Sequence, residues 1–309
     1  MKKGRPPKDP TKLAAYLALK AQEQTAHSVK SGKAESIIDL NKSIVYVDDP
    51  NETEEDTILR IAERFDIMEK CTHGATDGVI RSLIVSGAGG VGKTYTVERI
   101  LDYAREEKGV KSEVVHGVVT PVNLYKLLYR NRHANNVVVL DDADSIFDED
   151  SALSVLKAAL DSTPKRKISW LAEGKSLKGK TGEGDTPTDF IYEGTMIFIT
   201  NLDFQKLVDM GKSRNVAHMQ ALMTRALYLD LRLHSTRDLT AWVKHIVGKA
   251  HILVQDGLSY EQEKEILDFI GENAANLRNL SIRTALKMGA FVKMVGADWK
   301  IMAKHTEFR

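Results

Sequence analysis

Short apolar runs alternate along the middle of the chain with segments in which apolar residues recur every three to four positions. The apolar runs predict five strands, at residues 81–85, 112–119, 136–140, 195–200 and 228–233. The segments of helical spacing predict helices at residues 94–106, 120–132, 149–162, 202–207 and 217–227. Apolar strands separated by helices are typical of a parallel sheet that is covered on both faces. The pattern therefore predicts an α/β fold, with a five-stranded parallel sheet flanked by helices.

The same pattern divides the chain into four parts. They are a basic disordered tail, a linker, an α/β domain and a small all-helical domain, with predicted boundaries at residues 1–33, 34–53, 54–235 and 236–309. The α/β domain opens with an acidic helix, and His73, Gly74 and Gly78 are expected to turn the chain into the first strand. The last part is expected to be helical throughout, with one helix starting within residues 276–283.

A lysine- and glycine-rich segment interrupts the α/β pattern before the fourth strand. Residues 165–172 and 189–192 have strand character, so a hairpin inserted over about 165–192 is predicted. The polar stretch between them holds three lysines, Lys175, Lys178 and Lys180. Their spacing suits the phosphate backbone of a nucleic acid, and they are candidate DNA contacts. A flexible surface insertion is the alternative.

Composition limits the classes of protein to which the chain can belong. Apolar residues make up 42% of the 309 residues, which suffices for a folded core. No run approaches the roughly 18 apolar residues of a membrane helix, so no membrane partner is expected. Cys71 is the single cysteine, which excludes an internal disulfide and fits a reducing cytoplasm, bacterial or of a phage-infected host.

The net charge of +1 hides an asymmetry between the tail and the remainder. Residues 1–33 hold eight Lys and Arg against two acids, a net +6, which leaves −5 for the remainder. Near its start the tail reads Lys-Gly-Arg-Pro-Pro-Lys around Arg5 and resembles the AT-hook, a short DNA-binding element. An extended arginine fits the narrow, negative minor groove of A·T-rich DNA, so Arg5 is a candidate DNA contact. A solvated tail that binds nothing is the alternative.

A glycine-rich segment lies between the first predicted strand and the helix that follows. Its residues are Gly87, Ala88, Gly89, Gly90, Val91, Gly92, Lys93 and Thr94, with Tyr95 beside them. They fit the P-loop pattern G-x-x-x-x-G-K-[ST], in which backbone N–H groups and a helix start surround phosphates. Lys93 is placed to reach the β- and γ-phosphates, and the Thr94 hydroxyl to ligate Mg²⁺. ATP with Mg²⁺ is the predicted ligand.

Polar side chains end the third and fourth predicted strands. Asp141 follows Lys93 by 48 residues and ends an apolar strand, where it can hold Mg²⁺ beside the P-loop. Asp142 is placed to orient or deprotonate the attacking water. Asn201 follows the fourth strand and can hydrogen-bond the γ-phosphate or that water. Lys93, Asp142 and Asn201 are therefore candidate catalytic residues.

The order of these features resembles the AAA+ ATPases over roughly residues 54–300. The resemblance rests on residues 87–94, 141–142, 201, 221–225 and 277–280, the last three in the places of sensor 1, the arginine finger and sensor 2. It implies a P-loop core followed by a helical lid. It further implies that Arg225 reaches into the site of a neighbouring subunit, and that Arg278 touches the γ-phosphate of its own. Arg283 is the alternative to Arg278.

Two features modify the resemblance. The second acid of most family members is glutamate, whereas Asp142 resembles the aspartate of initiator and helicase-loader relatives. Its side chain is one methylene shorter, so slow hydrolysis with intact binding is expected. The predicted hairpin resembles one that lines the central pore in helicase-like members, where its lysines would face a threaded substrate.

These observations favour an ATP-hydrolysing AAA+ motor or switch that acts on DNA, in replication, recombination or the handling of a phage genome. An arginine that acts across subunits implies a homo-oligomer, a ring or spiral of about six. One alternative is an AAA+ machine that remodels a protein partner. The other is an assembly scaffold that binds ATP and hydrolyses it poorly.

Overall fold

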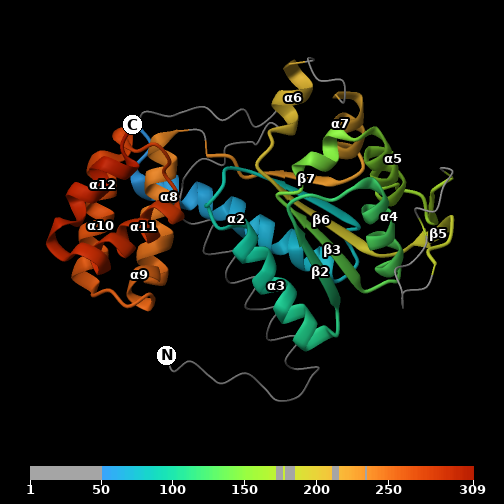
Figure 1. The fold of residues 1–309 in the computed structure, drawn as a ribbon, viewed down its shortest axis with the longest axis horizontal. Helices are drawn as coiled ribbons and strands as arrows, with labels where there is room; N and C mark the ends of the chain where they lie inside the picture. Colours follow the sequence, from blue (N-terminus) through green and yellow to red (C-terminus); the bar gives the residue numbers. More distant parts are fainter. Residues whose placement is uncertain (1–50, 172–176, 178–184, 211–215, 234) are drawn as a thin grey trace, which may run out of the picture. The chain divides into compact units, whose positions relative to one another are not determined.

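Five parallel strands form the sheet at the centre of the described structure (Figure 1). The computed structural model describes residues 51–171, 177, 185–210, 216–233 and 235–309. The strands are β1 (Ser82–Ser86), β2 (Lys111–His116), β3 (Asn136–Asp141), β6 (Thr195–Thr200) and β7 (Leu227–Asp230). Their order in the sheet is β2-β3-β6-β1-β7, and every pairing is parallel. The predicted five-stranded parallel sheet is confirmed.

The strand order brings three chain segments to one edge of the sheet. β6 lies between β1 and β3, with Ser86 opposite Thr200 and Ile199 opposite Asp141. The loop after β1, the acids at the end of β3 and the polar residues after β6 therefore leave the sheet side by side. Ligands of open α/β sheets bind at this edge, outside the carboxyl ends of the strands.

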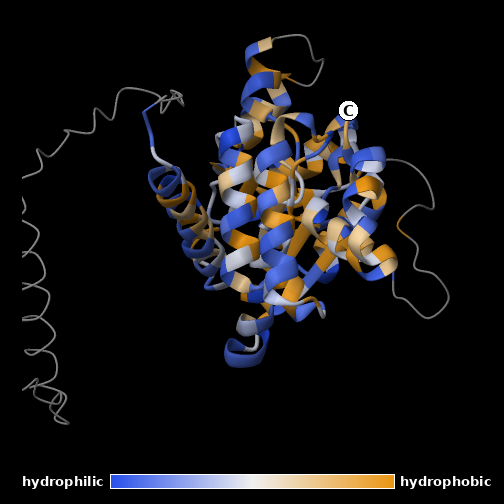
Figure 2. Cartoon of the chain, turned by 90° about the vertical axis from the view of Figure 1, so that its left-hand side faces the viewer, coloured by the Kyte–Doolittle hydropathy of each residue, from blue (hydrophilic) through white to orange (hydrophobic). Residues whose placement is uncertain are grey.

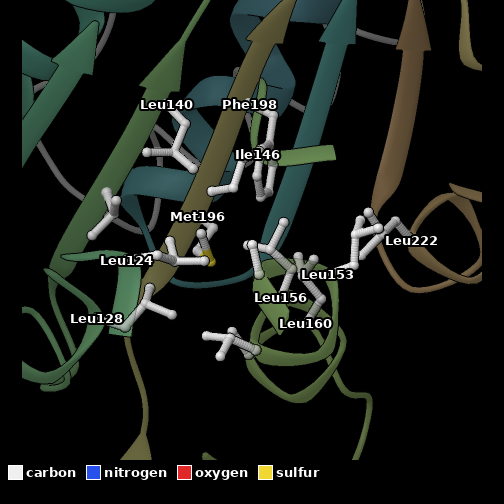
Figure 3. Packing of buried hydrophobic residues seen from close by; sticks show 14 of the residues in the cluster. Leu124, Leu128, Leu140, Ile146, Leu153, Leu156, Leu160, Met196, Phe198 and Leu222 are labelled. Carbon is white, nitrogen blue, oxygen red and sulfur yellow. The ribbon is translucent and has the colours of Figure 1, made fainter. Parts of the chain in front are cut away.

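Alternate strand residues pack against helices on opposite faces of the sheet. α2 (Glu54–Thr76) and α3 (Lys93–Lys108) cover the face of Leu83, Val139 and Ile197. The other face is covered by α4 (Pro121–Arg130), α5 (Asp150–Ala159), α7 (Val216–Met223) and the 3-10 helix η1 (Asp144–Asp148). Figure 3 shows Leu140 and Phe198 of this face pointing toward the leucines of α4 and α5. The three central strands β1, β3 and β6 are therefore buried along their whole length, whereas the edge strands β2 and β7 are partly exposed.

The start of α4 follows from its local sequence, and the turn predicted at His73, Gly74 and Gly78 is found only at Gly78. Thr120 caps α4 by accepting from Asn123 N, and Pro121 takes the first helical position, as predicted. His73 and Gly74 lie inside α2 and do not form a turn. A side chain at Gly74 would lie 2.8 Å from Ile80, so glycine permits this close packing. The chain turns instead at Asp77 and Gly78.

The predicted hairpin is present as β4 (Arg166–Ser169) paired antiparallel with β5 (Asp189–Tyr192). Arg166 fixes its base, because the guanidinium is buried, donates to the carbonyls of Ala159 and Gly194 and lies over the Tyr192 ring. After β6 follows α6 (Phe204–Met210). The helix predicted to end at Leu227 ends earlier, because Leu227 opens β7 and pairs with Leu83.

The C-terminal part of the chain is helical and has a core of its own. Its helices are α8 (Thr236–Ala250), α9 (Ile252–Gln255), α10 (Tyr260–Asn273), α11 (Ile282–Val295) and α12 (Trp299–Glu307), with the 3-10 helices η3 (Ala274–Asn276) and η4 (Gly296–Asp298). They pack around Val247, Ile270 and Met288. Polar and apolar residues alternate along the helices in Figure 2, as expected of amphipathic helices. We call residues 236–309 the lid.

One lid helix, α11, starts at Ile282, within the predicted residues 276–283, but the residues directly before it are not helical. Residues 277–281 separate η3 from α11, and Leu277 instead forms an isolated bridge with Phe308. The Arg278 N–H donates to the Glu307 carbonyl in the same pairing. Arg278 therefore lies on an extended segment that is paired with the end of the chain. None of the helices in the described ranges combines the length and apolar character that a membrane crossing requires.

Candidate functional site

The P-loop connects β1 to α3 and surrounds the ammonium group of Lys93. Lys93 Nζ donates to the carbonyls of Gly87 at 2.5 Å and Ala88 at 2.8 Å, and to Asn201 Oδ1 at 3.0 Å. The side chain is buried, and burial lowers the pKa of Lys93 to about 8, against the opposing charges of Asp142 and Asp141. All three of these hydrogen-bond acceptors are neutral oxygens. It remains available to pair with a more strongly negative group.

The backbone of the loop presents its N–H groups rather than its carbonyls. Gly90 has a φ of 72° and Gly92 a φ of 106°, a left-handed conformation that glycine adopts without strain. In the described part of the chain, no backbone acceptor is found for the N–H groups of residues 89–93. α3 starts at Lys93 and adds the positive end of its dipole. Such N–H groups and a helix start form an anion site.

Asp141 lies at the end of β3 and contacts two side chains. Thr94 Oγ1 is 3.1 and 3.3 Å from its two carboxylate oxygens, and Asp141 is 5% exposed. His116 Nδ1 lies 3.1 Å from Asp141 Oδ2. His116 was not expected here from the sequence; it ends β2 directly opposite Asp141 in the sheet register. Among the described residues no group of three His, Cys, Asp or Glu could hold a metal by itself, so a cation here would need oxygens from its ligand.

Asp142 and Asn201 form a second polar pair beside Lys93. Asn201 Nδ2 donates to Asp142 Oδ1 at 2.8 Å, while its amide oxygen accepts from Lys93. Asp142 has a φ of 51°, which is uncommon for a residue other than glycine and is better tolerated by Asp and Asn than by most residues. This backbone turn directs the chain away from the sheet immediately after Asp141. Thr200 donates to the nearby Asp144, and burial raises the pKa of that carboxyl.

Arg283 lines the P-loop cavity, whereas Arg278 lines only a second cavity, which Gly89 and Arg283 also line. A methyl group built on Gly89 would lie 3.9 Å from Arg283 Nη1 and 3.7 Å from Asn201 Oδ1. Arg283 is the second residue of α11 and lines the P-loop cavity. Arg278 lines a neighbouring cavity of about 550 Å³, and its Nε donates to the Phe308 carbonyl at 2.5 Å. The contact of Arg278 with the γ-phosphate stays a prediction, and in this structure the backbone of Arg278 is paired with the end of the chain.

Arg225 lies away from this cavity. Arg225 is exposed and lies just after α7. Its guanidinium donates to the Ala221 carbonyl at 2.9 Å, as a C-terminal helix cap would. Tyr95 follows Thr94 on α3 and is 73% exposed at the cavity margin. Arg5, Lys175, Lys178 and Lys180 lie outside the described residues.

The cavity at the P-loop has a volume of about 620 Å³, within the range of small-molecule sites. Its polar lining includes the P-loop, Asp141, Asp142 and Asn201. Its apolar lining includes Phe65 of α2 and three lid side chains, Trp242, Ile246 and Ile252. The Phe65 and Trp242 rings stack with their centroids 4.5 Å apart. The cavity thus joins an anion site to a flat apolar region, as a nucleotide requires. The apolar residues of this lining were not expected from the sequence.

Comparison with known proteins gives one relative in sequence and several in fold. The chain is 34% identical over 265 residues to the "Uncharacterized 36.7 kDa protein in nrdC-mobD intergenic region" of Enterobacteria phage T4, which covers 86% of this chain and 80% of that protein. No family model matches the chain.

Similarity to solved structures is found at low sequence identity. Domain III of the replication initiation protein DnaA from Thermotoga maritima is 13% identical, with a TM-score of 0.48 over 84% of this chain and 98% of that chain. AMPPCP-bound DnaA from Aquifex aeolicus is 12% identical, with a TM-score of 0.45 over 83% and 69%. Drosophila ORC bound to DNA is 13% identical, with a TM-score of 0.43 over 93% and 73%.

The chain's own architecture supports its fold assignment. A P-loop follows β1, two acids end β3, a polar residue follows the intervening β6, and a helical lid follows the sheet. This is the arrangement that the AAA+ resemblance implied. The chain has an AAA+ fold, and it belongs to the same family as the uncharacterized 36.7 kDa protein of Enterobacteria phage T4.

Proposed function

We propose that this protein binds ATP together with Mg²⁺ and hydrolyses it to drive a step on DNA, in the cytoplasm of a bacterium or a phage-infected cell. One observation carries the proposal. Lys93, the Thr94–Asp141 pair and the Asp142–Asn201 pair all line a single cavity. Each of these groups matches a requirement of phosphoryl transfer, and the apolar side chains of the cavity suit a base.

The residues present fit both the triphosphate and the metal. The N–H groups of residues 89–93 and the ammonium of Lys93 supply donors and positive charge for phosphate oxygens. Thr94 and Asp141 would hold Mg²⁺, since hydroxyl and carboxylate oxygens combined with phosphate and water oxygens are the ligands it prefers. Bound Mg²⁺ would offset the charge of the phosphate oxygens.

The Asp142–Asn201 pair supports a role in hydrolysis. The Asp142 carboxylate can accept a proton or a hydrogen bond from the attacking water, and Asn201 can fix its orientation by donating to Oδ1. Asn201 also accepts from Lys93, so one amide group links the phosphate-binding and the water-binding residues. The short side chain of Asp142 favours slow turnover.

Two arginines would complete the site. Arg283 lines the cavity from the lid, and we assign to it the contact with the γ-phosphate that the resemblance placed at Arg278. Arg225 is exposed and is assigned the transition-state contact in a neighbouring subunit, which requires an oligomer, a ring or spiral of about six. The basic residues of the tail and hairpin, Arg5, Lys175, Lys178 and Lys180, are proposed to contact DNA.

The test is steady-state ATP turnover with and without single- and double-stranded DNA, at two salt concentrations. Lys93→Ala serves as the blank. We expect turnover that DNA stimulates and that salt reduces, because contacts to phosphates release counterions. Turnover without any effect of DNA would favour a protein substrate.

A weakly hydrolysing scaffold is the second candidate, and the short Asp142 side chain favours it. Its signature is ATP binding that Lys93→Ala abolishes, with no turnover under any condition. An absence of ATP binding to the unaltered protein would overturn both proposals.

A further inference from the structure

The lid donates hydrogen bonds to two consecutive carbonyls of the P-loop, and we propose that Trp242 is a positioning residue that sets the loop for phosphate binding. This inference rests on the proposed ATP site. In this role Trp242 acts through its hydrogen bond to the backbone of the P-loop, and not through contact with the base of ATP.

The first contact comes from α8. The Trp242 indole Nε1–H donates to the Val91 carbonyl at 3.0 Å, across 151 positions of sequence. Both residues are buried, with 3% of Trp242 and 1% of Val91 exposed. Phe65 of α2 stacks on the indole, and His245 stacks at 5.7 Å on the same ring system. Since the ring is held by these neighbours, its N–H points at the loop in a fixed direction.

The second contact comes from the start of α11. The Ile282 N–H donates to the Gly90 carbonyl at 3.0 Å. Ser281 packs so closely that a side chain on Gly90 would lie 2.8 Å from Ser281 Cβ. Two lid helices that are distant in sequence thus hold adjacent peptide groups of the P-loop from the outside.

These contacts determine which way the loop peptides face. The carbonyls of Gly87 and Ala88 are bound by Lys93, and those of Gly90 and Val91 are bound by the lid. A peptide whose carbonyl is fixed outward presents its N–H inward. A peptide turned the other way would place a carbonyl oxygen beside the phosphates, where like partial charges repel. The lid therefore favours the loop conformation that binds anions.

The test compares Trp242→Phe with Trp299→Phe. Phenylalanine keeps a stacking ring and loses the indole donor. Trp299 is an equally buried lid tryptophan, at 3% exposed, and it contacts Phe269 rather than the loop. We measure the dissociation constants of ATP and of adenosine for both full-length variants, together with kcat and KM where turnover is detectable.

Loss of one hydrogen bond that orders the loop is expected to weaken ATP binding by about 3- to 10-fold in Trp242→Phe. The effect is expected in KM more than in kcat. Adenosine affinity should stay within about twofold of the unaltered protein, because adenosine has no phosphate for the loop to bind. Trp299→Phe should change neither constant, even where it lowers the melting temperature.

Two results would overturn the inference. One is unchanged ATP affinity in Trp242→Phe. The other is an equal loss for ATP and adenosine, which would make Trp242 a base contact. If the unaltered protein binds no ATP, the proposed function fails and the inference falls with it, which is a distinguishable outcome.

A second variant covers the case in which Trp242→Phe does not fold. Ile282→Pro removes the other lid donor at the first helical position, where proline is favoured. Ser281 before it is extended, with a ψ of 170°, as a residue before proline prefers. Ile282→Val, which keeps the N–H, is the control. The same selective loss of ATP affinity is expected in Ile282→Pro alone, and equal ATP affinities in both variants would contradict the inference.

Discussion

Asp142 is the residue at which binding and hydrolysis should separate. Asp142→Asn is expected to keep ATP affinity and to lower turnover by about 10²- to 10⁴-fold, the usual contribution of a general base. The substitution keeps the shape of the side chain, tolerates the left-handed φ of 51° and preserves an oxygen that can accept from Asn201. Turnover and equilibrium ATP binding are measured on the same preparation. Unchanged turnover would remove Asp142 from the mechanism.

The two lid arginines give a matched pair of variants. Arg283 lines the P-loop cavity and Arg278 hydrogen-bonds the Phe308 carbonyl. Arg283→Gln should lose a charge-assisted contact, which is worth about 1.5–3 kcal/mol, so kcat/KM for ATP is expected to fall by about 10- to 150-fold. Arg278→Gln should leave kcat/KM nearly unchanged. A large loss of kcat/KM in Arg278→Gln with little change in Arg283→Gln would instead assign the γ-phosphate contact to Arg278.

Residues inside a fixed local pattern could be placed from the sequence, whereas residues brought in by the fold could not. Lys93 and Thr94 follow from the P-loop pattern alone, and Asp141 from the acids that end an apolar strand. Trp242 reaches the P-loop only because α8 packs on α2, and His116 reaches Asp141 only through the sheet register. No spacing in the sequence records either contact.

At the scale of elements, charged side chains connect the start of α2 to the start of the lid. Arg60 of α2 binds Glu52 at 2.8 Å and the buried Asp238 of α8 at 2.9 Å, and Arg237 also contacts Glu52. The hydrogen bond from Arg60 lowers the pKa of Glu52 from 4.5 to about 2. The network holds α8 against α2. Trp242 lies on α8 and Phe65 on α2, so the same pair of helices also holds the two stacked rings together.

Glu52→Gln is therefore expected to destabilise the folded protein at pH 7 by about 1–3 kcal/mol, as the loss of a hydrogen-bonded charge does. Because the folded pKa is depressed, the stabilisation is fully present above pH 4.5 and is lost as the pH falls toward 2. Urea unfolding of both proteins at pH 7 and pH 3.5 should give a smaller difference at the lower pH. Glu54→Gln, which removes an exposed partner of Lys244, is the control and should change little.

Element type was more predictable than element ends. Apolar periodicity located the strands because both faces of the sheet are buried. It failed where distant contacts decide the conformation. Leu277 and Arg278 have good helix propensity but pair with the end of the chain, and Gly74 lies inside α2, where its missing side chain lets Ile80 pack closely. Such choices depend on tertiary contacts that local propensity does not contain.

At the scale of the whole molecule, the charge of the tail predicts salt-dependent binding to DNA. Residues 1–33 carry eight Lys and Arg against two acids, while the remainder of the chain is negative. Deletion of residues 1–33 should weaken DNA binding and flatten the dependence of log K on log salt, since each lost phosphate contact removes about 0.7–0.9 from the slope. Fluorescence anisotropy with labelled DNA over a salt series measures both. An unchanged slope would assign DNA binding, if present, to other residues.

The oligomer is tested most directly by mixing two inactive proteins. Lys93→Ala should lose ATP binding at its own site, and Arg225→Ala should lose about 10³–10⁵ in rate if its guanidinium acts on a neighbour. A subunit with Lys93→Ala still offers Arg225 to the next subunit. In a mixture of equal parts, about one quarter of the interfaces would join an intact ATP site to an intact Arg225, so about a quarter of the turnover should return.

ATP turnover is measured for an equal mixture of the two single variants. The controls are each variant alone, and the Lys93→Ala, Arg225→Ala double variant mixed with unaltered protein. Return of activity requires that the two residues lie in different subunits of one assembly, because neither protein holds a complete site. A mixture that stays inactive although sedimentation shows mixed oligomers would place Arg225 outside the catalytic site. Its hydrogen bond to the Ala221 carbonyl would then be its whole role, as the C-terminal cap of α7.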